Sequence, residues 1–205
     1  GTNLELTAGI VLSSGNVQSD PGNFIVGADG TTADFASNLM GGGSDPDLEL
    51  LSGQEINDKA ALEFDFIPTG DSLQFKYVFG SEEYPSYTCS DFNDAFGFFL
   101  SGPGIAGPYS GGAVNIALVP GTTVPVSINT LNSGVPSWPG DEPNCAALDP
   151  NWESNSVYFV DNAAQTGTIV TYDGFTVVLT AFALVQCGQT YHIKLAIGDG
   201  FDESF

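Results

Sequence analysis

The sequence predicts an all-β fold, an antiparallel β-sandwich or jelly-roll-like domain with long loops and at most one short helix. Apolar and polar residues alternate over short stretches, as in strands that bury one face, and turns rich in Gly, Pro, Asn and Asp separate them. The 205 residues, 42% hydrophobic and 12% aromatic, suit a packed core. We therefore expect one domain over residues 1–205, since no linker divides the chain.

The clearest pair of predicted strands lies between residues 62 and 79. Both strands alternate apolar residues with polar ones, and the turn at 68–71 separates them, so we expect a hairpin. The apolar positions are Leu62, Phe64, Phe66, Leu73, Phe75, Tyr77 and Phe79.

Patterns of the same kind predict most of the remaining elements. A helix fits only residues 47–60, where Gly53 would make it short or broken. Residues 129–156 are long and polar for a plain connection, and such loops are usually functional or locally stapled. Further strands are expected at 10–13, 96–100, 114–119, 123–128, 157–160, 168–172, 175–185 and 191–197.

The charge excludes several classes of partner. Asp and Glu number 25 against 3 Lys and Arg together, which gives a net charge of −22. This balance argues against binding to nucleic acid or to an anionic membrane surface, because both require basic side chains. No apolar run approaches the ~20 residues that span a bilayer, so no direct membrane insertion is expected. The lack of an initiator Met and a signal peptide predicts a mature or trimmed chain.

Several segments resemble the choice-of-anchor L domain, a family of secreted and cell-surface proteins found mainly in Bacteroidetes-type bacteria. The resemblance covers nearly the whole chain and implies an extracellular β-rich module, commonly part of a longer protein with a sorting signal. Family members tend to continue with a further apolar strand where this chain stops at Phe205, so the domain is expected to lack its own final strand. The segments are GIVLSSGNV, ALEFDFIPTGDSLQFKYVFGSEEY, CSDFNDAFGFFLSGPG, NIALVPGTTVPVSIN, VYFVDN and CGQTYHIKLAIGDGFDESF.

Two acidic segments are candidates for a structural Ca²⁺ site. Ca²⁺ takes carboxylate, amide and carbonyl oxygens, and bridging by a cation would offset the repulsion between neighbouring carboxylates. The alternative is a solvated acidic surface, since the spacing is not that of an EF-hand. The candidate ligands are Glu82, Glu83, Asp91, Asn93 and Asp94 in one loop, with Asp199 and Asp202 near the end of the chain.

Three cysteines in an extracellular chain predict one disulfide and one leftover thiol. We favour a bond between Cys89, in the acidic loop, and Cys145, in the long loop. Cys187 would then be buried and free, or paired with another chain. The sequence alone leaves all three pairings open.

Catalysis is not expected. The only histidine, His192, lies in an alternating strand, where a structural or surface role is the usual one. Carboxylate pairs that would suit a glycosidase are so abundant here that no single pair is specific. None of the GxSxG, HExxH or P-loop motifs is present.

Aromatic residues in polar loops support an alternative function, carbohydrate binding. Flat rings stack on sugar faces, and nearby carboxylates accept hydrogen bonds from sugar hydroxyls. The competing interpretation is that these rings pack the loops onto the sandwich. The candidates are Tyr84, Tyr87, Trp138 and Trp152.

Self-assembly is a third hypothesis. Leu4 and Leu6 alternate with polar residues over 2–8, as in a strand that could be donated to a neighbouring molecule. The missing strand after Phe205 would leave a groove to receive it, and head-to-tail repetition makes a filament. The alternatives are an ordinary first strand and a trimmed end. We predict a non-enzymatic extracellular structural or adhesive module, with itself, other cell-surface components or glycans as partners.

Overall fold

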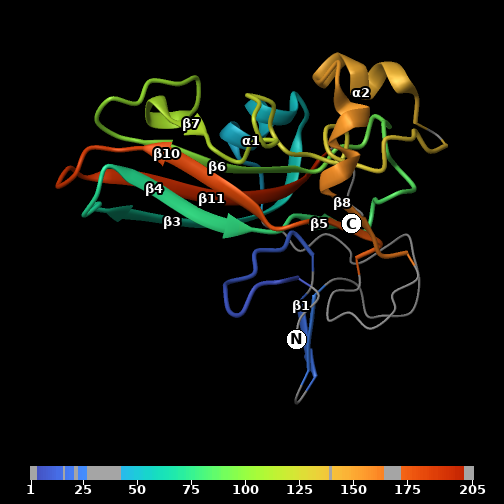
Figure 1. Ribbon diagram of the computed structural model, residues 1–205, viewed down its shortest axis with the longest axis horizontal. Coiled ribbons are helices and arrows are strands. Elements are labelled where there is room, and N and C mark those ends of the chain that lie inside the picture. The colour runs from blue at the N-terminus through green and yellow to red at the C-terminus, as the bar shows by residue number, and fades with distance from the viewer. Residues whose placement is uncertain are drawn as a thin grey trace.

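The computed structural model describes residues 4–15, 17–20, 23–26, 43–138, 140–163 and 172–200, and it confirms the all-β fold (Figure 1). Among these residues the strands form a four-stranded sheet, a three-stranded sheet and two sheets of two strands each. All strand pairs are antiparallel. One of the two-stranded sheets is the hairpin of β1 (Val17–Asp20) and β2 (Asn23–Val26).

The four-stranded sheet is the centre of the fold. Its order is β3 (Ile56–Phe66), β11 (Tyr191–Gly200), β6 (Ala95–Ser101) and β7 (Val114–Asn115). β6 reads AFGFFLS, a nearly continuous apolar run, because both of its faces are covered. β11 alternates less strictly for the same reason, since Ile193 packs in the main core and Ala196 packs in the cluster with Leu48.

A second layer, made of β4 (Ser72–Tyr77) and β10 (Leu179–Leu184), covers one face of this sheet (Figure 1). The main core between the layers is rich in aromatic rings that meet at tilted or edge-on angles. Phe98 of β6 is at its centre, with ring centroids 5.0 Å from Phe75 and 4.9 Å from Tyr77. Apolar residues of both layers thus interdigitate as in a sandwich.

The predicted hairpin between residues 62 and 79 is wrong. β3 pairs with β11 and β4 pairs with β10, so the loop at 67–71 carries the chain from one layer to the other. The connection from β10 to β11 crosses beside it, and the two loops are joined by hydrogen bonds from Val185 N to Asp71 O and from Gly188 N to Pro68 O. Of the apolar positions that the alternating pattern predicts, Leu62 and Phe64 are exposed, whereas the other five belong to the core or pack against it. The set of inward residues does not decide the pairing, because it is the same in a hairpin and in an arch between layers.

The opposite face of the main sheet is covered by α1 (Pro46–Ser52) and by the loop that contains η1 (Ser110–Gly112). Leu48 of α1 packs there with Ile56, Phe99 and Ala196. The helix ends at Gly53, whose φ of 74° is left-handed, and β3 begins shortly afterwards. The expectation of a short helix in this region is confirmed.

A three-stranded sheet carries the acidic loop. It consists of β5 (Gly80–Ser81), β9 (Gly174–Thr176) and β8 (Phe159–Asp161), and Glu82 follows β5 directly. Its strands are short, and Thr176 joins it to the chain beyond β4 by accepting a hydrogen bond from the Phe79 N–H.

The predicted strands at 96–100 and 191–197 are confirmed as β6 and β11, and 175–185 is divided into β9 and β10. The stretch 114–119 is reduced to β7, and 157–160 begins as a helical turn, with β8 starting at Phe159. The stretches at 10–13 and 123–128 form no strand, although Leu118 and Pro125 make one bridge. Of the expected strand at 168–172, all but Tyr172 lies outside the described residues.

The long segment at 129–156 contains a second helix, α2 (Glu142–Leu148), and it runs into η2 (Trp152–Tyr158). The expectation of at most one short helix is therefore wrong. A signal was present, since Asp141 precedes a first turn with Glu142 and Pro143, and helix-forming Ala and Leu follow. Within the described residues, no helix has the length and apolar character needed to cross a membrane.

Candidate functional site

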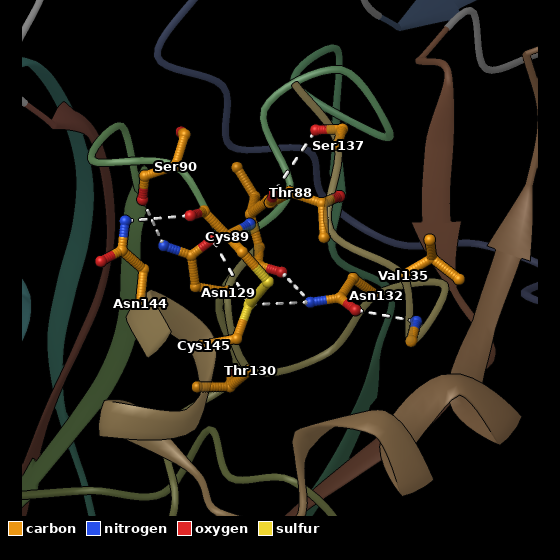
Figure 2. Close-up of a disulfide and its surroundings, with 12 residues drawn as sticks. Thr88, Cys89, Ser90, Asn129, Thr130, Asn132, Val135, Ser137, Asn144 and Cys145 are labelled. Carbon is orange, nitrogen blue, oxygen red and sulfur yellow. Dashed lines mark hydrogen bonds between the residues drawn. A yellow bond between two sulfur atoms is a disulfide. The ribbon is translucent and has the colours of Figure 1, made fainter. Parts of the chain in front are cut away.

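A disulfide between Cys89 and Cys145 confirms the favoured pairing and joins the acidic loop to α2 (Figure 2). Their Cα atoms lie 5.0 Å apart, and both side chains are fully buried. Trp152 of η2 packs against the bond. Two loops that are distant in sequence are thereby held as one body.

Asparagine side chains hold the backbone on both sides of Cys89 (Figure 2). Asn129 Oδ1 accepts a hydrogen bond from the Cys89 N–H at 2.7 Å, and its amide nitrogen donates to the Ser90 carbonyl at 2.9 Å. Asn144 donates to the Cys89 carbonyl at 3.0 Å. These bonds fix Cys89 at a φ of 62°, a left-handed conformation that residues with a Cβ rarely adopt.

Three carboxylates of the acidic loop are buried: Glu82, Glu83 and Asp94. Glu82 accepts a hydrogen bond from the Asp173 N–H at 3.3 Å, and Asp94 accepts one from the Gly200 N–H at 3.4 Å. The loop therefore contacts both β11 and the segment that precedes β9. These three carboxylates face inward, so they do not form the solvated acidic surface that is the alternative interpretation.

These carboxylates share their surroundings with two tyrosines. Burial, and then the negative charges of Glu83 and Asp94, raise the pKa of Tyr84 well above its ordinary value. Burial also raises the pKa of Tyr172, and the charges of Glu82 and Asp94 add to this effect. Negative charge is thus concentrated in a region of low solvent access.

The other predicted metal ligands are dispersed. Asp91 is exposed, Asn93 is buried and accepts a hydrogen bond from the Asn129 N–H at 3.3 Å, and Asp199 is fully buried on β11. Asp202 lies outside the described residues. In the part of the chain that the structure describes, no three or more His, Cys, Asp or Glu side chains form a group that could hold a metal ion. The Ca²⁺ site stays a prediction.

The prediction that Tyr84 and Trp152 bind a ligand is wrong. Tyr84 is 0% exposed, its ring lies between those of Phe79 and Phe159, and its hydroxyl donates to the Leu131 carbonyl. Trp152 is 2% exposed because it covers the disulfide. Neither ring presents a face to solvent, so both pack the loops onto the sandwich.

Trp138, in contrast, is 92% exposed. The backbone beside it is fixed, since the Ser137 N–H donates to the Thr88 carbonyl at 3.2 Å and the Ser137 hydroxyl donates to the Ser86 carbonyl at 2.6 Å. Figure 2 shows Ser137 next to Thr88. A Cβ on Gly140 would lie 2.1 Å from the Thr88 carbonyl oxygen, so only glycine permits this close approach. Tyr87, the remaining candidate, is half-buried edge-on against Phe92.

A buried ion cluster that the sequence does not predict lies beneath α1. Lys194 of β11 contacts Asp45 and Asp47, and all three are buried. Burial alone would lower the pKa of Lys194, but hydrogen bonds and the charges of the two aspartates raise it above its ordinary value. For Asp47, burial opposes the hydrogen bonds from Lys194 and the Ser110 N–H, which lower its pKa. The burial of Lys194 is not predictable from the sequence, because a charged residue in an alternating strand normally points outward.

The remaining candidates are Cys187, His192, Leu4, Leu6 and Phe205. Cys187 is a free, exposed thiol rather than a buried one. His192 is on the surface, with Nδ1 2.9 Å from Asp65. Leu4 and Leu6 are half-buried in a segment without strand structure, and Phe205 lies outside the described residues. Strand donation between molecules stays a prediction.

The sandwich, the stapled loops and the acidic composition together define a class, the β-rich modules of proteins that fold outside the reducing cytosol. The model of the Choice-of-anchor L domain family matches residues 1–205, and the chain belongs to this family. The family is a non-catalytic type of surface domain, which indicates a cell-surface or secreted protein. No curated protein and no solved structure matches the chain.

Proposed function

We propose that the chain is a non-enzymatic structural and adhesive module whose contact surface is the pinned loop around Trp138. The observation that carries this proposal is the contrast between a side chain 92% exposed and a backbone fixed by two bonds from Ser137 and by the adjacent disulfide. The Trp138 indole contributes little to the packing of the fold, because most of its surface is in contact with water. The residue before it is nevertheless bonded to Thr88, which is itself buried.

This arrangement suits binding for energetic reasons. A loop that is ordered before binding loses little conformational entropy when a ligand arrives. Tryptophan is also among the residues that contribute most at contact surfaces. Val135 in the same loop and Val157 in η2 are exposed as well, and Gly134 would meet Ser156 if it carried a Cβ, so the two segments are neighbours. The loop therefore offers an apolar surface larger than one ring.

The ligand class that we propose is a neutral glycan. An exposed indole stacks on the apolar face of a sugar, and Asp141 and Glu142, both exposed a few residues further on, can accept hydrogen bonds from hydroxyl groups. A net charge of −22 repels sialylated or uronic acid glycans at long range. Neutral sugars avoid this repulsion.

We expect Trp138→Ala to weaken binding to neutral glycans at least ~30-fold, because loss of a central aromatic contact costs about 2 kcal/mol or more. The measurement is a glycan array followed by titration calorimetry on the strongest hit. Leu184→Ala is the matched control, since Leu184 is exposed on β10, outside this loop. Equal binding by wild type and Trp138→Ala, or no binding by the wild type to any neutral glycan, would contradict the proposal.

We also propose that Ca²⁺ stabilises the acidic loops, with no more than two carboxylates from Glu82, Glu83, Asp94 and Asp199 as ligands and amide or carbonyl oxygens as the others. Their burial and their oxygen chemistry support this, as does the charge of −22. We expect EDTA to lower the midpoint of thermal unfolding by roughly 5–10 °C, given a stabilisation of about 2.7 kcal/mol at 100-fold saturation. Added Ca²⁺ should restore it.

Two variants make this experiment specific. Glu83→Gln should abolish most of the EDTA effect, whereas Asp91→Asn should retain it, because Asp91 is exposed and Glu83 is buried. An unchanged midpoint in EDTA would count against any stabilising metal.

A further inference from the structure

The Lys194 amino group lies within hydrogen-bond distance of two carboxyl groups. Its Nζ is 2.7 and 3.0 Å from the two oxygens of Asp45, and 2.5 Å from Oδ2 of Asp47. The lysine side chain is 10% exposed and each aspartate side chain 4%. A primary amine and a carboxyl group are thus held together with little water between them, which is the arrangement that favours reaction between them.

We propose that Lys194 and Asp45 condense into an intramolecular isopeptide bond, with Asp47 transferring the proton. The Nζ attacks Cγ of Asp45, an N–C bond forms, and one C–O bond breaks. The ammonium group gives up two of its three protons, and both leave with the departing oxygen as one water molecule. The step is neutral in oxidation state and needs no other reactant.

Asp45 has the geometry of the acceptor. Both of its oxygens contact the amine, whereas Asp47 does so through one. Asp45 Oδ1 also accepts hydrogen bonds from the N–H groups of Asp47 and Leu48, at 3.0 and 3.2 Å. Fixed donors of this kind stabilise the negative charge that develops on an oxygen when a nucleophile adds to the carbon.

Asp47 has the geometry of the proton carrier. Its Oδ2 touches Nζ, and its Oδ1 is fixed by the Ser110 N–H at 2.7 Å. It can take a proton from the amine and give it to the oxygen that leaves Asp45, as a general base and then a general acid. After the reaction, the same carboxylate can accept a hydrogen bond from the new amide N–H.

Two further features favour the amide over the ion pair. The ring of Phe99 covers Nζ, with its centroid 5.0 Å away, and this ring sits over Gly97, where any Cβ would lie 2.6 Å from it. Water is thereby kept from the new bond. The reaction also replaces two buried charges by a neutral group, and burial of charge is costly even when the charges are paired.

The bond would connect the residue that precedes α1 with the central strand of the sheet. Its two ends are 149 positions apart in sequence, and it encloses the disulfide without sharing any residue with it. This inference does not depend on the adhesive role, since it concerns the residues beneath α1 and not the loop around Trp138.

Intact-mass spectrometry of the reduced, purified protein tests the proposal. We expect the wild type to be lighter than its sequence by one water molecule, whereas Lys194→Ala and Asp45→Ala should each have the full mass calculated for their sequence. Lys59→Ala is the matched control and should keep the loss, although Lys59 also lies 3.8 Å from Asp45. A wild type of full mass overturns the proposal, and so does a loss that persists in Lys194→Ala.

Peptide mapping separates this bond from cyclisation of an Asp–Gly pair, which also releases water. The expected product is one branched peptide that contains residues 45 and 194, with a mass equal to the sum of two peptides less one water. Separate, unmodified peptides with these residues would overturn the proposal. Asp47→Asn should keep the fold but yield mostly unlinked chain, and full linkage in that variant would remove Asp47 from the mechanism.

Discussion

Replacing both Cys89 and Cys145 by alanine should lower the free energy of unfolding by about 4 kcal/mol, because the bond closes a separation of 56 residues in the unfolded chain. The loss includes the packing of Trp152, which lies against the two sulfurs. Urea denaturation of the double variant under non-reducing conditions measures the change. The expected result is a lower midpoint with a slope close to that of the wild type.

Cys187→Ala provides the control for this experiment. The Cys187 thiol is free and exposed, so its removal should change the free energy of unfolding by no more than about 0.5 kcal/mol. Reduction of the wild type should reproduce the effect of the double variant. If the double variant were destabilised by less than ~1 kcal/mol, the chain-entropy account of the staple would be wrong.

Tyr84→Ala should cost about 3–5 kcal/mol, the usual cost of deleting a fully buried aromatic side chain. The ring fills the space between Phe79 and Phe159, and its hydroxyl satisfies the Leu131 carbonyl. Tyr84→Phe keeps the ring and removes only that hydrogen bond, so its cost should be about 1–3 kcal/mol. Thermal and urea unfolding of both variants give these values.

The same pair of variants separates a packing role from a binding role. Tyr84→Phe should bind glycans as the wild type does, because the ring has no face in solvent. A Tyr84→Ala variant as stable as the wild type would show that the loop does not depend on this ring. A Tyr84→Phe variant that folds normally but loses glycan binding would show that Tyr84 takes part in ligand binding.

The sequence predicted the class of fold because alternation reports burial directly. It failed on strand pairing for the same reason: Phe66 and Phe75 point into one core whether their strands pair with each other or lie in opposite layers. Pairing depends on partners far along the chain, β11 and β10, about which local alternation carries no information. The helix α2 was missed because the length and polarity of its segment outweighed the capping signal around Pro143.

The candidate site was predictable in part. The favoured pairing of Cys89 with Cys145 is confirmed, although the sequence alone leaves all three pairings open. The sequence does not show which aromatic candidates are buried and which are free to bind a ligand, because a tryptophan in a polar loop can do either. Only the difference in burial distinguishes Trp152 from Trp138. The contact between Lys194 and Asp45 could not be predicted, because it depends on tertiary packing between residues 149 positions apart.

The position of β11 has a consequence for folding. This strand lies between β3 and β6 in the main sheet, yet it follows every other described strand in the sequence. The sheet therefore cannot close until residues 191–200 have been synthesised, and its pairings span most of the chain, which makes folding slow. Until β11 has been synthesised, β3 and β6 lack the strand that lies between them, so the apolar faces of the main sheet stay open while most of the chain is being made.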